Sequence, residues 1–120
     1  FDTPDGSCIR DFINVVDLAK AQEFAIRRIL EKTQNVKDAE FNIGTGRGVS
    51  VLELINGFEK ATGVKLNYQI VGRRAGDIEK VWANPDFANQ ELGWKAVETL
   101  EDTLRSAWNW QLKLRERGIQ

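Results

Sequence analysis

The spacing of apolar and polar positions predicts four helices. From Asp17 to about Lys32, apolar side chains recur every three or four residues and form one stripe on a helix. Ser50 followed three residues later by Glu53 is a capping box, which signals a second helix ending at Gly63. Two further helices are expected, one from Asn84 and Pro85 to Gly93 and one from Thr99 to Gly118, with Asp17, Ser50, Asn84 and Thr99 as the N-caps.

Short strand-like segments lie between these helices. Residues 9–15 alternate apolar and polar side chains, residues 41–43 form a short apolar run, and residues 66–71 form an apolar stretch. Residues 81–83 are expected to be a brief extended piece, and residues 34–39 a polar connection. Strands that alternate with helices predict an α/β fold, and right-handed crossovers would make part of its sheet parallel.

The composition is that of one globular domain over residues 1–120, with 42% apolar and 29% charged residues. A net charge of −1 offers no basic field for nucleic acid, and no apolar run is long enough to span a membrane. Cys8 is the only cysteine, which excludes an internal disulfide and favours a cytoplasmic location. The lack of methionine and the start at Phe1 predict an internal fragment of a longer protein.

Two further absences exclude familiar catalytic machinery. The sequence has no histidine, so it can form neither a Ser-His-Asp triad nor a histidine-ligated metal site. Tyr68 is the only tyrosine, and Gly72 stands four residues after it, so a Tyr-x-x-x-Lys catalytic pair cannot be present. We therefore expect no catalytic residue, no cofactor-binding residue and no metal ligand among these 120 residues.

A glycine-rich loop, residues 44–48, lies between an expected strand and a helix. The dinucleotide fingerprint needs a glycine at the sixth position, where this chain has Val49. The strand expected at residues 66–71 also carries no acidic residue for a ribose. These departures favour a structural turn from strand to helix, whose N-terminus could still face a ligand.

The segment Arg73-Arg74-Ala75-Gly76-Asp77 is the strongest candidate for binding chemistry. Adjacent arginines repel one another unless an acidic group or an anion pairs with them, and a guanidinium matches two phosphate oxygens at once. Together with Arg10, one of them could clamp a diphosphate, while Asp77 could accept from ribose hydroxyls. The alternative is a turn that carries ordinary surface charges.

Several motifs resemble UDP-glucose 4-epimerases of the extended short-chain dehydrogenase family. Residues 5–19, with their Arg-Asp-Phe-Ile-Asn-Val core, resemble the family's Asp-Gly-Thr-x-x-Arg-Asp-Tyr-Ile-His-Val-x-Asp-Leu-Ala. Residues 41–46 and 73–77 are similar to its Tyr-Asn-Leu-Gly-Thr-Gly and Arg-Arg-Pro-Gly-Asp. Residues 91–94, Glu-Leu-Gly-Trp, and 108–111, Trp-Asn-Trp-Gln, match further landmarks of that family, so the resemblance covers nearly the whole chain.

The resemblance implies an α/β fold that corresponds to the C-terminal, substrate-binding part of an extended short-chain dehydrogenase. The family interconverts UDP-glucose and UDP-galactose in galactose metabolism, through a transient 4-keto intermediate formed with tightly held NAD. NAD is then expected to be bound by an N-terminal Rossmann domain outside this sequence, and the 120-residue fragment alone is expected to be an inactive part of an isomerase.

The resemblance also assigns residues to the nucleotide. Arg10 and Arg74 would contact the diphosphate, and Asp77 would hold the uridine ribose. Phe12 stands where a tyrosine usually lies near the nucleotide, so a contact by that hydroxyl would be lost. Val81 matches a position that borders the sugar pocket. Because valine is smaller than the tyrosine of some members, we hypothesise that N-acetylated UDP-sugars are accepted; the alternative is that Val81 only packs.

Two other functions remain open at this point. The chain could belong to another nucleotide-sugar epimerase or to a dehydratase of the same family, or it could be a non-catalytic module that binds a nucleotide diphosphate. The expected partner is a UDP-sugar rather than nucleic acid or a membrane. The parent protein is expected to be a homodimer, and the fragment is expected to self-associate through exposed apolar surface.

Overall fold

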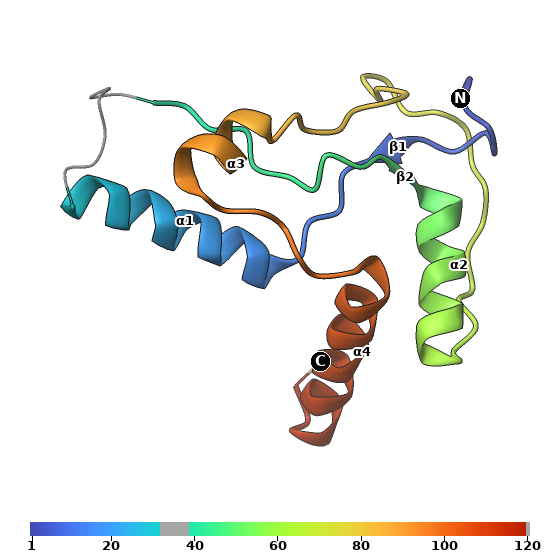
Figure 1. The fold of residues 1–120 in the computed structure, drawn as a ribbon. Helices are drawn as coiled ribbons and strands as arrows, with labels where there is room; N and C mark the ends of the chain where they lie inside the picture. Colours follow the sequence, from blue (N-terminus) through green and yellow to red (C-terminus); the bar gives the residue numbers. More distant parts are fainter. Residues whose placement is uncertain (32–38, 120) are drawn as a thin grey trace.

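The computed structural model describes residues 1–31 and 39–119, which form four helices around a very short sheet (Figure 1). The expected helix end at Lys32 and most of the connection over residues 34–39 lie outside the described residues. The elements in chain order are β1 (Ile9–Arg10), α1 (Val15–Leu30), β2 (Val49–Ser50), α2 (Val51–Thr62), α3 (Asp86–Leu92) and α4 (Leu100–Glu116).

The capping signals located two helix starts correctly. The Ser50 hydroxyl accepts from the Glu53 N–H at 3.0 Å and the Glu53 carboxylate accepts from the Ser50 N–H at 2.8 Å, so the predicted capping box of α2 is confirmed. The Thr99 hydroxyl accepts from the Asp102 N–H at 3.1 Å at the start of α4, as expected. Gly63 takes the left-handed conformation that ends α2.

Two expected N-caps were wrong. Helix α1 begins at Val15, because the side-chain Oδ1 of Asn14 accepts from the Val16 N–H at 2.8 Å and Asn14 is therefore the cap in place of Asp17. At α3, Pro85 occupies the capping position in place of Asn84, and the helix begins at Asp86, one residue later than predicted. At α1 two polar residues, Asn14 and Asp17, lie near the helix start, and the sequence pattern alone did not distinguish between them.

The α/β class is confirmed, but the sheet is shorter than predicted. Strands β1 and β2 pair antiparallel, with Ile9 opposite Ser50, and the parallel component is a single bridge between Ile9 and Lys80. The strands expected over residues 41–43 and 66–71 were wrong. In the described part of the chain these apolar stretches have no strand partner, and an alternating or apolar pattern forms a strand only beside a neighbour that completes its hydrogen bonds.

One small core lies between α1 and α3. Its buried residues are Ala21, Ala88, Leu92 and Trp94. The Trp94 indole N–H donates to the Asp17 carbonyl at 2.9 Å, and the fully buried Asp17 carboxylate accepts from the N–H groups of Val97 and Glu98 at 3.1 and 2.9 Å. Asp17 therefore anchors the segment that joins α3 to α4, and Trp94 packs in the core beside it.

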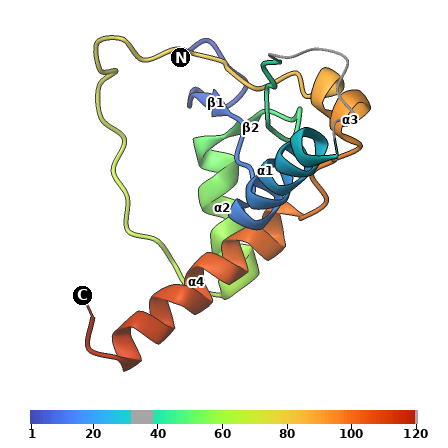
Figure 2. The same ribbon diagram turned by 90° about the vertical axis from the view of Figure 1, so that its left-hand side faces the viewer.

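A second contact joins α2 to α4, which run beside each other (Figure 2). Phe58 and Trp108 meet edge to face, with ring centroids 5.7 Å apart. Gly57 lets the helices approach, because a Cβ there would lie 3.3 Å from a methyl group of Leu104. Trp110 points away and remains half exposed.

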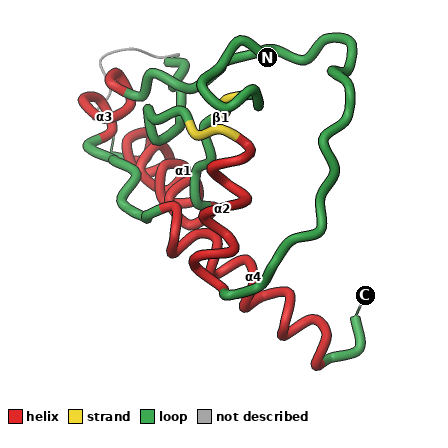
Figure 3. The backbone as a smooth tube through the Cα atoms, turned by 90° about the vertical axis from the view of Figure 1, so that its right-hand side faces the viewer, coloured by secondary structure: helices red, strands yellow, loops and turns green. Residues whose placement is uncertain are grey.

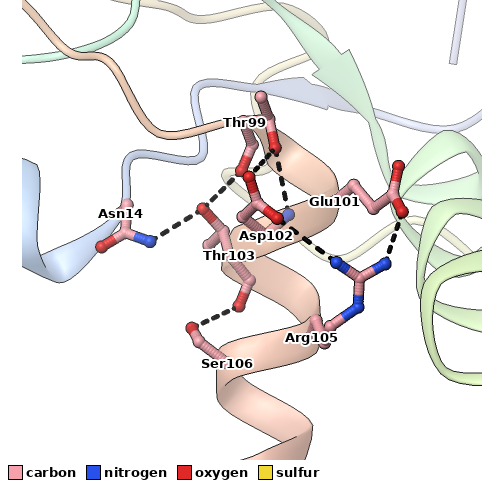
Figure 4. Close-up of polar contacts among 7 residues, drawn as sticks. All are labelled: Asn14, Thr99, Glu101, Asp102, Thr103, Arg105 and Ser106. Atoms are coloured by element: carbon pink, nitrogen blue, oxygen red, sulfur yellow. Dashed lines mark hydrogen bonds and ion pairs between the residues drawn. The ribbon is translucent and has the colours of Figure 1, made fainter.

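Asn14 connects the start of α1 to α4 (Figure 4). Besides capping α1, its side-chain amide donates to the Thr103 hydroxyl of α4 at 3.0 Å. Thr103 in turn donates to the Thr99 carbonyl at 2.8 Å, within the first turn of α4. Arg105 pairs with Glu101 and Asp102 on the exposed side of the same helix. The sequence did not indicate a role for Asn14, and the structure gives it this one.

Residues 64–76 arch away from the helices as a long extended segment (Figure 3). Among the described residues, no helix has both the length and the apolar character that crossing a membrane requires.

Candidate functional site

The double-arginine segment forms a tight turn closed by its own carboxylate. Gly76, with a φ of 84°, supplies the left-handed conformation of this turn. Asp77 accepts from the Arg74 backbone N–H and from the Arg74 side-chain Nε and Nη2, each at 3.3 Å. The Arg74 side chain is 85% exposed and the Asp77 side chain 22%. A paired but accessible guanidinium therefore stands at the tip of residues 72–78, which we name the arginine loop.

The two neighbouring arginines have different surroundings. Arg73 pairs with Glu79 at 3.2 Å, donates to the Asp77 carbonyl at 2.5 Å and lies 4.8 Å over the ring of Phe1. These contacts hold Arg73 in the fold. By contrast, Arg74 contacts only its own loop among the described residues, and its Nη1 atom is left for a ligand. The assignment of Arg74 to the diphosphate, which the resemblance implies, stays a prediction.

Arg10 lies on a distant stretch of the chain and contributes a positive charge that also acts on Asp77. It lies on β1, and its Nη1 atom donates to the Ile9 carbonyl at 2.8 Å. The pKa of Asp77 lies below its ordinary value, mainly because of the Arg74 side-chain hydrogen bond and, to a smaller extent, because of the positive charges of Arg74 and Arg10. Charges from residues 10 and 74 therefore both act on Asp77, which stays ionised at neutral pH.

A cleft of about 440 Å³ opens beside Arg10. Its lining residues are Arg10, Asp11, Asn42, Val81, Trp82, Ala83 and Asn84. Of the residues assigned from the sequence, Arg10 and Val81 line this cleft, whereas Phe12, Arg74 and Asp77 are not among its lining residues. Asn42, Trp82 and Asn84 were missed. Trp82 and Asn84 reach the cleft because residue 9 pairs with residue 80 in the fold, which brings the segment after Lys80 alongside Arg10 and Asp11.

A larger cleft, of about 560 Å³, is lined by Arg73 of the arginine loop. It is walled by α2, the N-terminal turn and the extended segment, with Leu52, Ile55, Tyr68 and Ile70 among its lining residues. Its two charged residues are already engaged: Asp5 bonds to Ser7 and Ser50, and Arg73 bonds to Glu79. This apolar cleft therefore offers few free polar groups to a nucleotide.

Two N–H groups of the glycine-rich loop point at the carboxylate of Asp11 and bond to it. The Asp11 carboxylate accepts from the Thr45 N–H at 3.1 Å, the Thr45 hydroxyl at 2.7 Å, the Gly46 N–H at 3.1 Å and the Ala83 N–H at 3.3 Å. We name this arrangement the Asp11 junction. Gly44 is needed there because a Cβ would lie 2.6 Å from both the Ala83 methyl and Asp11 Oδ2. The loop does not turn from a strand into a helix as expected, because residues 41–43 form no strand and the loop leads into β2. Its N–H groups at Thr45 and Gly46 are bonded to Asp11 and are not free for the pyrophosphate of NAD.

Comparison with known proteins supports the resemblance drawn from the motifs. No family model matches the chain. The UDP-glucose 4-epimerase of Dictyostelium discoideum is 46% identical over 111 residues, which are 92% of this chain and 32% of that protein. The chain therefore spans about a third of the length of the curated relatives it matches.

Solved structures give the same result. A UDP-glucose-4-epimerase from Stenotrophomonas maltophila, with bound NAD and formylated UDP-arabinopyranose, superposes with a TM-score of 0.91 at 41% identity over 98% of this chain and 34% of the other. The UDP-glucose 4-epimerase from Bifidobacterium longum, in complex with NAD+ and UDP, has a TM-score of 0.82 at 44% identity over 94% of this chain and 32% of the other. The homologues of this chain are UDP-glucose 4-epimerases, and the recognition made from the sequence is confirmed.

Proposed function

We propose that residues 1–120 form the UDP-sugar-binding domain of a UDP-glucose 4-epimerase. The observation that carries this proposal is geometric: the exposed Arg74 guanidinium is held 3.3 Å from the Asp77 carboxylate, in a loop that leads into the segment paired with Ile9, next to Arg10. Two guanidinium groups can satisfy the oxygens of a diphosphate that water would otherwise solvate. An ionised Asp77 can accept hydrogen bonds from the ribose hydroxyls.

In this proposal the chain binds and orients the substrate, and the hydride chemistry belongs elsewhere. The homologous structures hold NAD, which would accept and return the hydride during epimerisation. The glycine-rich loop of this chain does not fit that cofactor, because Asp11 occupies its N–H groups. In this proposal these residues take no part in the hydride transfer. Arg10 and Arg74 would hold the UDP end of the substrate while either face of the sugar is presented to NAD.

Val81 supports a proposal about the sugar. Its side chain lines the cleft beside Arg10 and is 46% exposed, so a small residue here leaves space next to the diphosphate site. We expect the enzyme that carries this sequence to turn over UDP-N-acetylglucosamine as well as UDP-glucose. Val81→Tyr should reduce turnover of the N-acetylated substrate selectively. Turnover of UDP-glucose alone by the unaltered enzyme would contradict the proposal.

Assembly and location also remain proposals. Apolar side chains of α1 are exposed, including Ile26 at 56% and Leu30 at 75%, which supports self-association of the fragment and a homodimeric parent. Light scattering across a concentration series tests this, and a monomer throughout would count against it. Cys8 is a free thiol, which is compatible with the proposed cytoplasmic location.

Titration of the 120-residue chain with UDP tests the binding role directly. We expect millimolar affinity, because the cleft is open and would leave base and sugar largely in water. Nuclear magnetic resonance should show UDP shifting the Arg10 and Arg74 side-chain signals, with the shifts lost in Arg10→Gln and Arg74→Gln. Inorganic phosphate serves as the matched probe without a ribose. The absence of any shift at these side chains in several millimolar UDP would overturn the proposal.

A further inference from the structure

The Asp11 carboxylate takes the place of a backbone group in the pairing of two strands. Ile9 donates to the Glu79 carbonyl at 2.9 Å and accepts from the Val81 N–H at 3.1 Å, which is the parallel pattern. If that ladder continued, the Ala83 N–H would donate to the backbone carbonyl of residue 11. Instead it donates to Asp11 Oδ2 at 3.3 Å. The side chain thus extends the pairing by one step while the backbone leaves toward α1.

The same carboxylate ties this pairing to a third stretch of chain. Its bonds to the Thr45 N–H and hydroxyl and to the Gly46 N–H place the glycine-rich loop against β1. Close packing reinforces the arrangement, because a Cβ on Gly48 would lie 2.6 Å from Ile9 Cγ2 and 2.8 Å from the Trp82 ring. The Asp11 side chain therefore fixes the positions of residues 45–46 and 83 relative to β1.

The register of residues 79–83 decides where the arginine loop lies relative to Arg10. Arg10 is adjacent to Asp11 on one side of this pairing, and Asp77 lies two residues before Glu79 on the other. Apart from the contact of Arg73 with the Phe1 ring, the remaining contacts of the arginine loop lie within the loop or with Glu79, namely the Arg74–Asp77 contacts and the Arg73 bonds to Asp77 and Glu79. A shift of residues 79–83 along β1 would carry Asp77 and Arg74 away from Arg10.

We propose that Asp11 is the positioning residue of the diphosphate site: its carboxylate fixes β1, the glycine-rich loop and residues 79–83 together, and so keeps Arg10 within reach of Asp77 and Arg74. Asp11 touches no ligand in this scheme and acts through Arg10. The inference rests on the proposed function for its biological meaning, whereas the alignment of Arg10 with Asp77 can be measured without a nucleotide.

The measurement is the pKa of the Asp77 carboxyl, followed by carbon NMR in the full chain. Arg10→Gln should raise this pKa, because it removes a positive charge that favours the carboxylate. Asp11→Asn should also raise it, and the double variant should raise it no further than Arg10→Gln alone. The sign is decisive, because the loss of the negative charge of Asp11 without any movement of Arg10 could only lower the pKa of Asp77. A fall or no change in folded Asp11→Asn would overturn the proposal.

Thr45 supplies a milder and uncharged version of the same test. Thr45→Val removes the hydroxyl donor to Asp11, and Thr45→Ser keeps it. We expect the Asp77 pKa to rise in the valine variant and to return to the wild-type value in the serine variant. A purely local role of Asp11 in the glycine-rich loop would leave the Asp77 pKa unchanged in both. This pair decides the question even if Asp11→Asn does not fold.

A UDP titration then separates this inference from the proposed function. Asp11→Asn should weaken UDP binding by about the same factor as Arg10→Gln. If UDP affinity is unchanged by Arg10→Gln and Arg74→Gln, the diphosphate role fails, while the Asp77 pKa still reports whether Asp11 positions Arg10. If those two variants weaken UDP binding and Asp11→Asn does not, the positioning role fails and the proposed function stands.

Discussion

The Asp11 junction and the arginine loop hold their carboxylates in opposite ways. Asp11 is partly buried and accepts from backbone and hydroxyl donors on two other stretches of the chain. Asp77 sits in an exposed loop, is paired with Arg74 only three residues away, and receives the charge of Arg10 from a distance. The first arrangement depends on tertiary packing, whereas the second is mostly local. We infer that the junction provides stability and geometry, and that the arginine loop provides accessible charge.

The largest effect should come from filling the space at the junction. In Gly44→Ala, the new Cβ would lie 2.6 Å from the Ala83 methyl and from Asp11 Oδ2, so the loop must move and the Asp11 bonds must stretch. We expect a loss of about 1–3 kcal/mol in the free energy of unfolding, as for overpacking elsewhere. Urea denaturation measures it. Gly72→Ala in the arginine loop is the matched control, since nothing lies within 4 Å of its Cβ position, and it should change stability by less than about 0.5 kcal/mol. Equal losses would remove the contrast between the two regions.

The next effect concerns the two hydroxyl N-caps. Ser50→Ala removes the cap of α2 and, with it, the hydroxyl that donates to Asp5 in the N-terminal turn. Thr99→Ala removes the cap of α4, which is far from the junction. Each substitution should cost about 1 kcal/mol of stability. We expect the larger loss for Ser50, because it is buried and bonded to a second segment. A larger loss for Thr99→Ala in thermal unfolding would contradict this order.

The two neighbouring arginines should separate stability from binding. Arg73→Gln removes an ion pair and a contact with the Phe1 ring, and we expect a loss of about 0.5–1 kcal/mol in stability with UDP binding largely kept. Arg74→Gln should leave stability nearly unchanged, because its side chain is 85% exposed, yet abolish the UDP response. Chemical denaturation and UDP titration of both variants give the comparison. The reverse assignment of the two effects would show that Arg73 is the ligand residue.

The smallest effect is the pH dependence that the carboxyls of Asp5 and Asp77 contribute. The pKa of Asp5 is lowered mainly by the hydrogen bond from the Ser50 hydroxyl and then by the bonds from Ser7, and the pKa of Asp77 is lowered mainly by Arg74. A carboxyl with a lowered pKa in the folded state adds stability that is fully present above its unfolded pKa and is lost as the pH falls through the folded value. Asp5→Asn and Asp77→Asn should therefore flatten the loss of stability below about pH 4. If the free energy of unfolding of these variants fell as steeply with pH below about 4 as that of the wild type, the lowered pKa values would be contradicted.

Several features of this protein followed from local sequence alone. The capping box at Ser50 and the cap at Thr99 were predictable, because a cap needs only a hydroxyl or carboxylate near a helix start and a donor three residues away. The arginine turn was predictable for a similar reason, since Arg74 and Asp77 are close in sequence and Gly76 permits the bend. The motifs also sufficed to recognise homology to UDP-glucose 4-epimerases.

Other features were decided only by tertiary structure. The apolar stretch at residues 66–71 has the composition of a strand, but it has no strand pairing in the described chain, because a strand is completed by its neighbours. At residues 66–71 the sequence predicted a pairing that does not form, whereas at Asp11 it did not predict the contacts that do form. The role of Asp11 depends on donors 34, 35 and 72 positions away. Local hydrogen-bonding chemistry can be found by counting along the chain, whereas contacts that require two distant segments to meet exist only once the fold has brought them together.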